Sequence, residues 1–146
     1  MLGHVYADIE ITGAKGLQKI EKVLVDTGAS TTILPLNIIE ETGGIKIPTE
    51  PVELELGDGR RVKAEVYGVG IKLKGRRAGT LILSFEDAKT VIGVRTLEDL
   101  GLKPNPITGE LEEERPPGVY YFYNISPPVL SPIFLWLTSQ MYGGSI

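Results

Sequence analysis

Alternation of apolar and polar side chains marks the beginning of the chain. Residues 5–11 alternate strictly, and this period of two predicts a strand with one buried face. A second apolar run, 20–25, leads directly into Asp26, and β-branched residues resume at Thr31. The pattern therefore predicts two strands, with a short loop that begins at Asp26 held between them.

A second alternating stretch, residues 52–66, has the pattern of a β-hairpin. A two-residue turn at Asp58-Gly59 would pair apolar Leu56 with a charged residue and mix the two faces. Pairing Leu56 with Val62 keeps apolar residues opposite each other and joins opposite charges on the other face. This pairing requires a tip of at least three residues, so we expect a long, glycine-flanked tip.

The remaining elements are short and are separated by glycine and proline. Gly43 and Gly101 follow two short apolar segments, as is typical where helices end. The basic cluster at 72–77 is interpreted as a solvated turn. With 18 glycines and 10 prolines in 146 residues, the composition favours many turns, and we expect a single all-β domain. Further strands are expected at 69–74, 79–85 and 90–92, and short helices at 36–41 and 96–100.

Charge and composition exclude several kinds of function. The formal net charge is −4 and the pI is about 5.1, whereas nucleic-acid-binding proteins present clustered lysine and arginine, so no nucleic-acid partner is expected. The chain has no cysteine and one histidine, His4, which excludes disulfides, thiolate nucleophiles and cysteine-type metal sites. We expect no metal and no cofactor. The first residues lack the pattern of a secretory signal, so the expected location is cytoplasmic.

The composition changes near the C-terminus. Three glutamates and two prolines precede an aromatic, proline-interrupted segment, and we interpret residues 1–112 as the principal domain and residues 113–146 as a C-terminal extension. Its longest apolar run, 133–137, is too short to span a bilayer, which needs about 20 residues. We expect burial in the core or in a subunit interface, with contact to a partner or a membrane surface as the alternative.

The loop at Asp26 carries a motif that recurs in one family. Asp-Thr-Gly, residues 26–28, lies between the two strands, and VIGVRTLEDLGL follows at 91–102, with Gly93 as a tight packing point. Over residues 5–111, this order of elements resembles the retropepsin-like (retroviral-type) aspartic proteases. The resemblance implies a closed, barrel-like acid-protease fold with one or two short helices and one lobe per chain.

The resemblance also implies roles for the loop residues. Asp26 would be the catalytic acid, and the Thr27 hydroxyl would tie the two active-site loops together. Gly28 would let the substrate backbone approach, and Ala29 and Ser30 would line the floor of the site. The loop is therefore expected to be both the catalytic centre and part of the substrate-binding surface.

The hairpin would be the flap that covers the substrate, with Gly57, Asp58 and Gly59 at its tip. The chain departs from the family at one position. Several retroviral members pair an acidic residue just after the loop with an arginine that follows the later glycine, and here these places hold Ser30 and Val94. That ion pair is therefore expected to be absent or rebuilt.

The chemistry of peptide hydrolysis independently requires a partner for Asp26. One carboxylate must act as general base towards water, and a second, protonated acid must polarise the carbonyl. None of the other four aspartates lies in an Asp-Thr/Ser-Gly loop, and the chain is too short for two lobes. A twofold homodimer would supply the second acid by bringing two copies of Asp26 to its axis.

The sequence therefore predicts an aspartic endopeptidase that hydrolyses polypeptides by water attack across a homodimer. The alternative is a non-catalytic dimerisation or peptide-binding module of the same fold, since a fold does not guarantee an activity. Such a module could also be peripheral to a membrane through its C-terminal extension.

Overall fold

The elements of the chain are mostly short strands. The computed structural model describes residues 4–119, and within them it has ten strands and two helices. The all-β prediction is confirmed. The strands are β1 (Val5–Thr12), β2 (Leu17–Val25), β3 (Thr32–Ile33), β4 (Ile45–Lys46), β5 (Val52–Glu55), β6 (Arg61–Leu73), β7 (Arg76–Ser84), β8 (Val91–Ile92), β9 (Leu102–Asn105) and β10 (Glu110–Glu113), and the helices are α1 (Leu36–Thr42) and α2 (Val94–Leu100).

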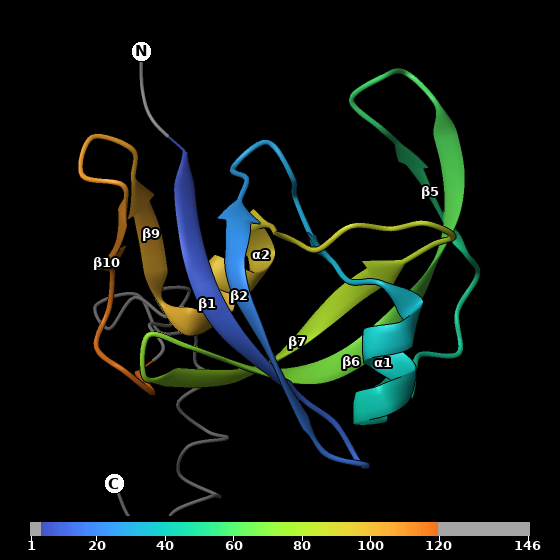
Figure 1. Cartoon of the computed structure of the whole chain (residues 1–146), viewed down its shortest axis with the longest axis horizontal. Coiled ribbons are helices and arrows are strands. Elements are labelled where there is room, and N and C mark those ends of the chain that lie inside the picture. Colours follow the sequence, from blue (N-terminus) through green and yellow to red (C-terminus); the bar gives the residue numbers. More distant parts are fainter. Residues whose placement is uncertain (1–3, 120–146) are drawn as a thin grey trace, which may run out of the picture.

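Most of the strands join in one sheet that closes on itself. Its order is β1-β2-β8-β3-β7-β6-β4, and β1 also pairs with β6, from Ile9 opposite Leu73 to Thr12 opposite Gly70. The extra pairing brings the sheet round into the barrel seen in Figure 1. The closed, barrel-like architecture is therefore confirmed, while β9 and β10 form a separate two-stranded sheet.

The core lies inside this barrel and under the two helices. Side chains of β1 and of the last residues of β2 alternate inward, as their period of two predicts, whereas β7 ends in three consecutive buried residues. Each helix ends at a glycine in the left-handed conformation, Gly43 with φ of 80° and Gly101 with φ of 70°. The fully buried aliphatic side chains are Ile11, Leu34, Ile39, Leu73, Ile82 and Ile92.

The strand β6 is longer than the sequence pattern predicts. One arm of the predicted hairpin and the following predicted strand, 69–74, are a single 13-residue strand. Gly68 and Gly70 lie inside it without interrupting its pairing with β7. A side chain at Gly70 would collide with Thr12 on β1, so this glycine permits the close contact that closes the barrel.

The hairpin formed by β5 and β6 has the expected alternation but a different register. Leu54, not Leu56, lies opposite Val62, and residues 56–60 form the tip. Apolar residues still face each other, because moving the register by two residues preserves the faces. The longer tip is closed by a hydrogen bond of 2.7 Å from the Leu56 N–H to the Arg60 carbonyl. The prediction of a tip longer than two residues is confirmed, and the predicted pairing is wrong by two residues.

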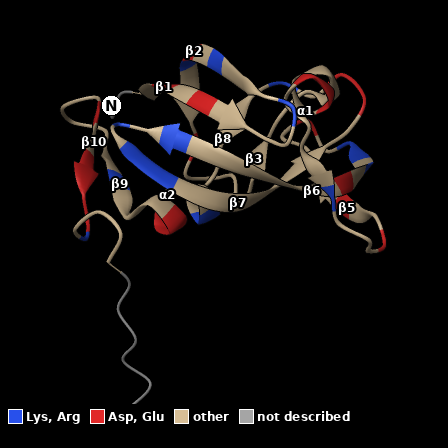
Figure 2. Ribbon diagram, turned by 90° about the horizontal axis from the view of Figure 1, so that it is seen from below, with Lys and Arg blue, Asp and Glu red and all other residues tan. Residues whose placement is uncertain are grey.

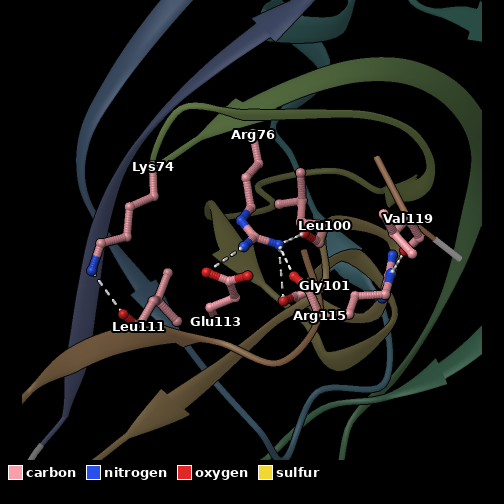
Figure 3. Close-up of polar contacts among 8 residues, drawn as sticks. All are labelled: Lys74, Arg76, Leu100, Gly101, Leu111, Glu113, Arg115 and Val119. Carbon is pink, nitrogen blue, oxygen red and sulfur yellow. Dashed lines mark hydrogen bonds and ion pairs between the residues drawn. The ribbon is translucent and has the colours of Figure 1, made fainter. Parts of the chain in front are cut away.

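The basic cluster at 72–77 is only partly a solvated turn, because Arg76 is buried. Its Nη1 donates hydrogen bonds to the carbonyl oxygens of Leu100, Gly101 and Arg115 at 3.0, 3.2 and 2.6 Å, and its Nη2 lies 3.4 Å from Glu113 (Figure 3). The sequence suggested a solvated arginine because its partners are carbonyls far along the chain. Arg76 instead fixes the residues that follow α2.

The boundary predicted between residues 112 and 113 stays a prediction. Strand β10 ends at Glu113, and Arg115 donates hydrogen bonds to the carbonyls of Glu98 and Asp99 at 2.5 and 2.8 Å. The aromatic part of the extension, and the core, subunit or membrane contacts expected of it, lie outside the described residues. Among residues 4–119, no helix is long and apolar enough to cross a membrane.

Candidate active site

The Asp-Thr-Gly loop begins where β2 ends, and its carboxylate is exposed. Oδ1 of Asp26 accepts a hydrogen bond of 2.8 Å from the N–H of Gly28, and the Asp26 carbonyl accepts one of 3.0 Å from the N–H of Ala29. A Cβ on Gly28 would lie 3.1 Å from Oδ1, so a glycine leaves the carboxylate undisturbed. The turn therefore fixes one oxygen of Asp26 and presents the group to solvent.

A second segment, residues 92–95, binds this loop through backbone hydrogen bonds. The N–H of Asp26 donates to the Ile92 carbonyl at 2.9 Å. In return, the N–H groups of Val94 and Arg95 donate to the carbonyls of Ala29 and Ser30 at 2.9 and 3.1 Å. The loop is thus joined by backbone hydrogen bonds to the start of α2, although the two segments lie far apart in the sequence.

Gly93 makes this contact sterically feasible. A Cβ at this position would lie 2.5 Å from the carbonyl oxygen of Thr31, a distance that real Cβ atoms essentially never show. The backbone of Gly93 has φ of −99°, which any residue can adopt. Glycine is therefore required at position 93 because the Thr31 backbone lies so close, and not because of its backbone conformation. The prediction of a tight packing point is confirmed.

Behind the loop lies a set of buried hydroxyls that the sequence did not reveal. Thr32 donates to Thr96 at 2.6 Å, Thr96 and Thr80 are 3.1 Å apart, and Thr80 donates to Oδ2 of Asp99 at 2.9 Å. The N–H of Gly93 donates to the Thr32 hydroxyl at 3.0 Å. In the sequence these threonines only stand within apolar runs. Threonine is common in strands because it is β-branched, so its presence there does not predict a buried hydrogen bond.

Ser30 and Val94 stand where several retroviral members have an ion pair between an acidic residue and an arginine. The Ser30 carbonyl instead accepts the backbone N–H of Arg95, so this connection is made by main-chain atoms. Ser30 is exposed and Ala29 is half-buried. Both residues lie in the loop as predicted, while their contact with a substrate stays a prediction.

The predicted flap residues lie at the tip of the β5–β6 hairpin, at the same edge of the barrel as the loop that follows β2 (Figure 1). Asp58 accepts hydrogen bonds from the backbone N–H of Arg60 at 3.0 Å and from its Nε at 2.7 Å. The Arg60 N–H, then its guanidinium, holds the pKa of Asp58 below the ordinary value of an aspartate. The tip hydrogen bonds are internal to the hairpin.

Charged residues of both signs occur along this hairpin (Figure 2). Arg61 lies 3.7 Å from both Glu53 and Glu55, and all three side chains are largely exposed. Exposed pairs of this kind contribute little to stability, about 0–1 kcal/mol. These pairs join the two strands of the hairpin to each other and do not attach it to the barrel.

The cavity with the largest volume among those described lies away from the Asp26 loop. A cavity of about 640 Å³ lies between the β1–β2 turn, β4, β6 and β7, and Asp26 does not line it. Within residues 4–119, no group of three or more histidine, aspartate or glutamate side chains is placed to hold a metal ion. The loop presents the Asp26 carboxylate at an exposed surface.

Comparison with known proteins supports the fold. No family model and no curated protein matches the sequence. Among solved structures, EIAV protease complexed with the inhibitor HBY-793 matches with a TM-score of 0.51 and 26% identity, over 69% of this chain and 89% of that protein. The chain is therefore similar in fold to a retroviral protease. Together with the closed sheet and the loop at Asp26, the similarity defines a retropepsin-like fold.

Proposed function

We propose that this protein is an aspartic endopeptidase whose active site forms when two copies bring their Asp26 carboxylates together. The observation that carries the proposal is the exposed Asp26 carboxylate, oriented by the Gly28 N–H at 2.8 Å, in the Asp-Thr-Gly loop of a retropepsin-like fold. The solved neighbour is a protease in complex with an inhibitor, which agrees with a peptide-binding role for the fold.

The proposed reaction is direct attack of water on a peptide carbonyl. One Asp26 carboxylate takes a proton from water as the oxygen attacks the carbonyl carbon, and the protonated Asp26 of the second copy donates to the carbonyl oxygen. The Asp26 that took the proton from water then gives it to the amide nitrogen, and the other Asp26 takes a proton back from a hydroxyl of the tetrahedral intermediate. The C–N bond breaks, which releases the amine and the carboxylic acid and leaves one proton on the pair of Asp26 residues. Two carboxyl groups that lie side by side share one proton, because the repulsion between two negative charges disfavours ionisation of both.

The other loop residues act around this pair. Thr27 ties the two loops together across the dimer, and Gly28 leaves room for the substrate backbone. Ala29 and Ser30 form the floor, and the hairpin tip at 57–59 covers the substrate. The polypeptide would lie between the loop and the hairpin, at the edge of the barrel where both project (Figure 1).

The direct test replaces the carboxylate. Asp26→Asn keeps the size of the side chain and an oxygen that can accept the Gly28 N–H, so folding is expected to be preserved. Peptide hydrolysis is expected to fall by about 100-fold or more, because general acid–base catalysis contributes about that much. Asp8→Asn is the matched control, since its Oδ1 accepts the Lys22 N–H in the wild type and the amide oxygen can still do so.

Dilution supplies a second measurement. Specific activity is expected to fall as the protein dissociates, and sedimentation should show a dimer at active concentrations. Full activity in Asp26→Asn, or activity from a protein that sediments only as a monomer, would contradict the proposal. A wild-type protein that binds a peptide without cleaving it, and that no transition-state analogue binds, would favour the non-catalytic module instead.

A further inference from the structure

We infer that Asp99 and the three buried threonines between it and the loop are positioning residues for Asp26. The inference rests on the proposed function, because it concerns the same carboxylate. It starts from a directed chain of hydrogen bonds that runs from the Gly93 N–H through Thr32, Thr96 and Thr80 to Asp99.

The direction of the chain is fixed at both ends. A backbone N–H can only donate, so Thr32 must accept from Gly93, and a carboxylate accepts, so Thr80 donates to Asp99. Each threonine has one hydroxyl proton. Thr32 uses its proton on Thr96, and Thr80 uses its proton on Asp99, which leaves the Thr96 proton for Thr80. Every hydroxyl then donates once and accepts once, and one arrangement satisfies the whole chain.

Burial makes this arrangement strict. Thr32 and Thr96 are 0% exposed and Thr80 is 6% exposed, so water cannot replace a lost partner. A buried hydroxyl without a partner costs about 1–3 kcal/mol. Thr96 and Asp99 stand three residues apart on α2, which places them on one face of the helix, towards β7. A small rotation of α2 or β7 would break at least one of the hydrogen bonds that link these hydroxyls.

The far end of the chain is itself held in place. Arg115 donates to the backbone carbonyls of Glu98 and Asp99. Arg76 donates to those of Leu100 and Gly101, as Figure 3 shows. Two guanidinium groups thus occupy the carbonyl end of α2, where a positive charge is also favoured by the helix dipole. Asp99 is therefore a fixed point, and the chain of hydroxyls ties the Asp26 loop to it.

The near end of the chain reaches the carboxylate through the backbone. Thr32 lies at the end of the loop, and Gly93 lies between the residues that bond to Asp26, Ala29 and Ser30. A shift of Thr32 or Gly93 therefore moves the turn that orients Oδ1 of Asp26. Two copies of this carboxylate must meet within hydrogen-bond range of one water, where small displacements are expensive.

The test removes one hydroxyl from the middle of the chain. Thr96→Val keeps the shape and leaves Thr32 and Thr80 without their partner, while Thr96→Ser keeps the hydroxyl. We expect Thr96→Val to lower kcat about 10- to 100-fold with KM within about twofold, because the loss concerns alignment and not substrate binding. Thr96→Ser should restore kcat to within about threefold of the wild type.

Thr42→Val is the matched control. Thr42 is also buried, at 1% exposed, but its hydroxyl donates to the Ile38 carbonyl inside α1, away from the loop. It should lower the melting temperature without lowering kcat. Asp99→Asn, which keeps an acceptor oxygen, should stay near the wild type, whereas Asp99→Leu should follow Thr96→Val.

A second measurement is independent of peptidase activity. The Gly28 amide donates to Asp26, so its ¹H–¹⁵N resonance reports the orientation of the carboxylate. Thr96→Val should shift this resonance and speed hydrogen exchange at Gly93, and Thr42→Val should do neither. If Thr96→Val does not fold, Thr80→Val and Thr80→Ser replace the pair.

The outcomes separate the two proposals. If the wild type cleaves no peptide, the proposed function fails, and the Gly28 and Gly93 amides still decide the inference. The inference is overturned if Thr96→Val keeps wild-type kcat, or leaves both amides unchanged. It is also overturned if Thr42→Val loses as much kcat as Thr96→Val, because the effect would then follow stability alone.

Discussion

Two loops of this protein share a local motif and use it differently. In the Asp26 loop and in the hairpin tip, an aspartate accepts the N–H of the residue two positions later, from Gly28 at 2.8 Å and from Arg60 at 3.0 Å. Asp58 also binds the Arg60 side chain with its second oxygen. Within residues 4–119, the second oxygen of Asp26 has no hydrogen-bond partner, so it is open to a reacting group.

The surroundings of the two loops differ as well. The Asp26 loop is attached to residues 92–95 by three backbone hydrogen bonds and rests on buried hydroxyls. The hairpin tip bonds to itself and carries exposed charges. Under the proposed function, a catalytic group must be held to within fractions of an ångström and a covering hairpin must open and close, and the two sets of contacts agree with these different needs.

The largest expected effect comes from disturbing the attachment of the Asp26 loop. Gly93→Ala would place a methyl group 2.5 Å from the Thr31 carbonyl oxygen, and we expect the free energy of unfolding to fall by about 2–3 kcal/mol, as in overpacked cores. Urea denaturation measures the change. Gly79→Ala is the control, because nothing lies within 4 Å of a Cβ there. Equal stability of the two variants would show that the contact is not tight.

A smaller effect is expected at the hairpin tip. Gly59 has φ of +86°, and alanine there costs about 1–2 kcal/mol of left-handed strain. Gly57→Ala is the control, since this glycine has no positive φ and a Cβ would meet open space. Hydrogen exchange of the hairpin amides should become faster in Gly59→Ala while the Asp26 loop stays unchanged. Faster exchange in the loop as well would mean that the two regions are coupled.

The smallest effect concerns the charge at the tip. Arg60→Ala removes the side-chain bond but not the backbone N–H, so the pKa of Asp58 should rise part of the way towards its ordinary value. The folded pKa is lowered, so the order that this contact gives to the tip is present above the ordinary pKa and is lost as the pH falls through the lowered one. NMR titration of the Asp58 carboxyl carbon measures both values. An unchanged pKa in Arg60→Ala would assign the whole shift to the backbone.

The sequence predicted what depends on local pattern. Strand alternation, glycine-ended helices and the Asp-Thr-Gly loop follow from neighbours along the chain, and the structure has them where expected. For the hairpin, the sequence correctly predicted which residues share a face but not which residues pair. Alternation fixes the faces and does not fix the length of the tip. The hydrogen bonds of Asp58 and Arg60 decide that length, and they were not visible in the pattern.

Contacts between distant segments could not be predicted. Arg76 looked like a solvated charge because its acceptors are backbone carbonyls, which every residue has and which no sequence pattern marks. Thr32, Thr80 and Thr96 looked like ordinary β-branched strand or helix residues. Their partnership appears only when β3, β7 and α2 are brought together, so this part of the site needed the folded structure.

The closure of the barrel has a consequence for synthesis on the ribosome. Strand β1 is made well before β6, yet one of its edges pairs with the end of β6, at Ile71 and Leu73. Until that stretch emerges, the N-terminal strand has an unsatisfied edge that other nascent chains could occupy. Pairing between such remote segments also slows folding. Newly made chains would therefore depend on protection of this edge during translation.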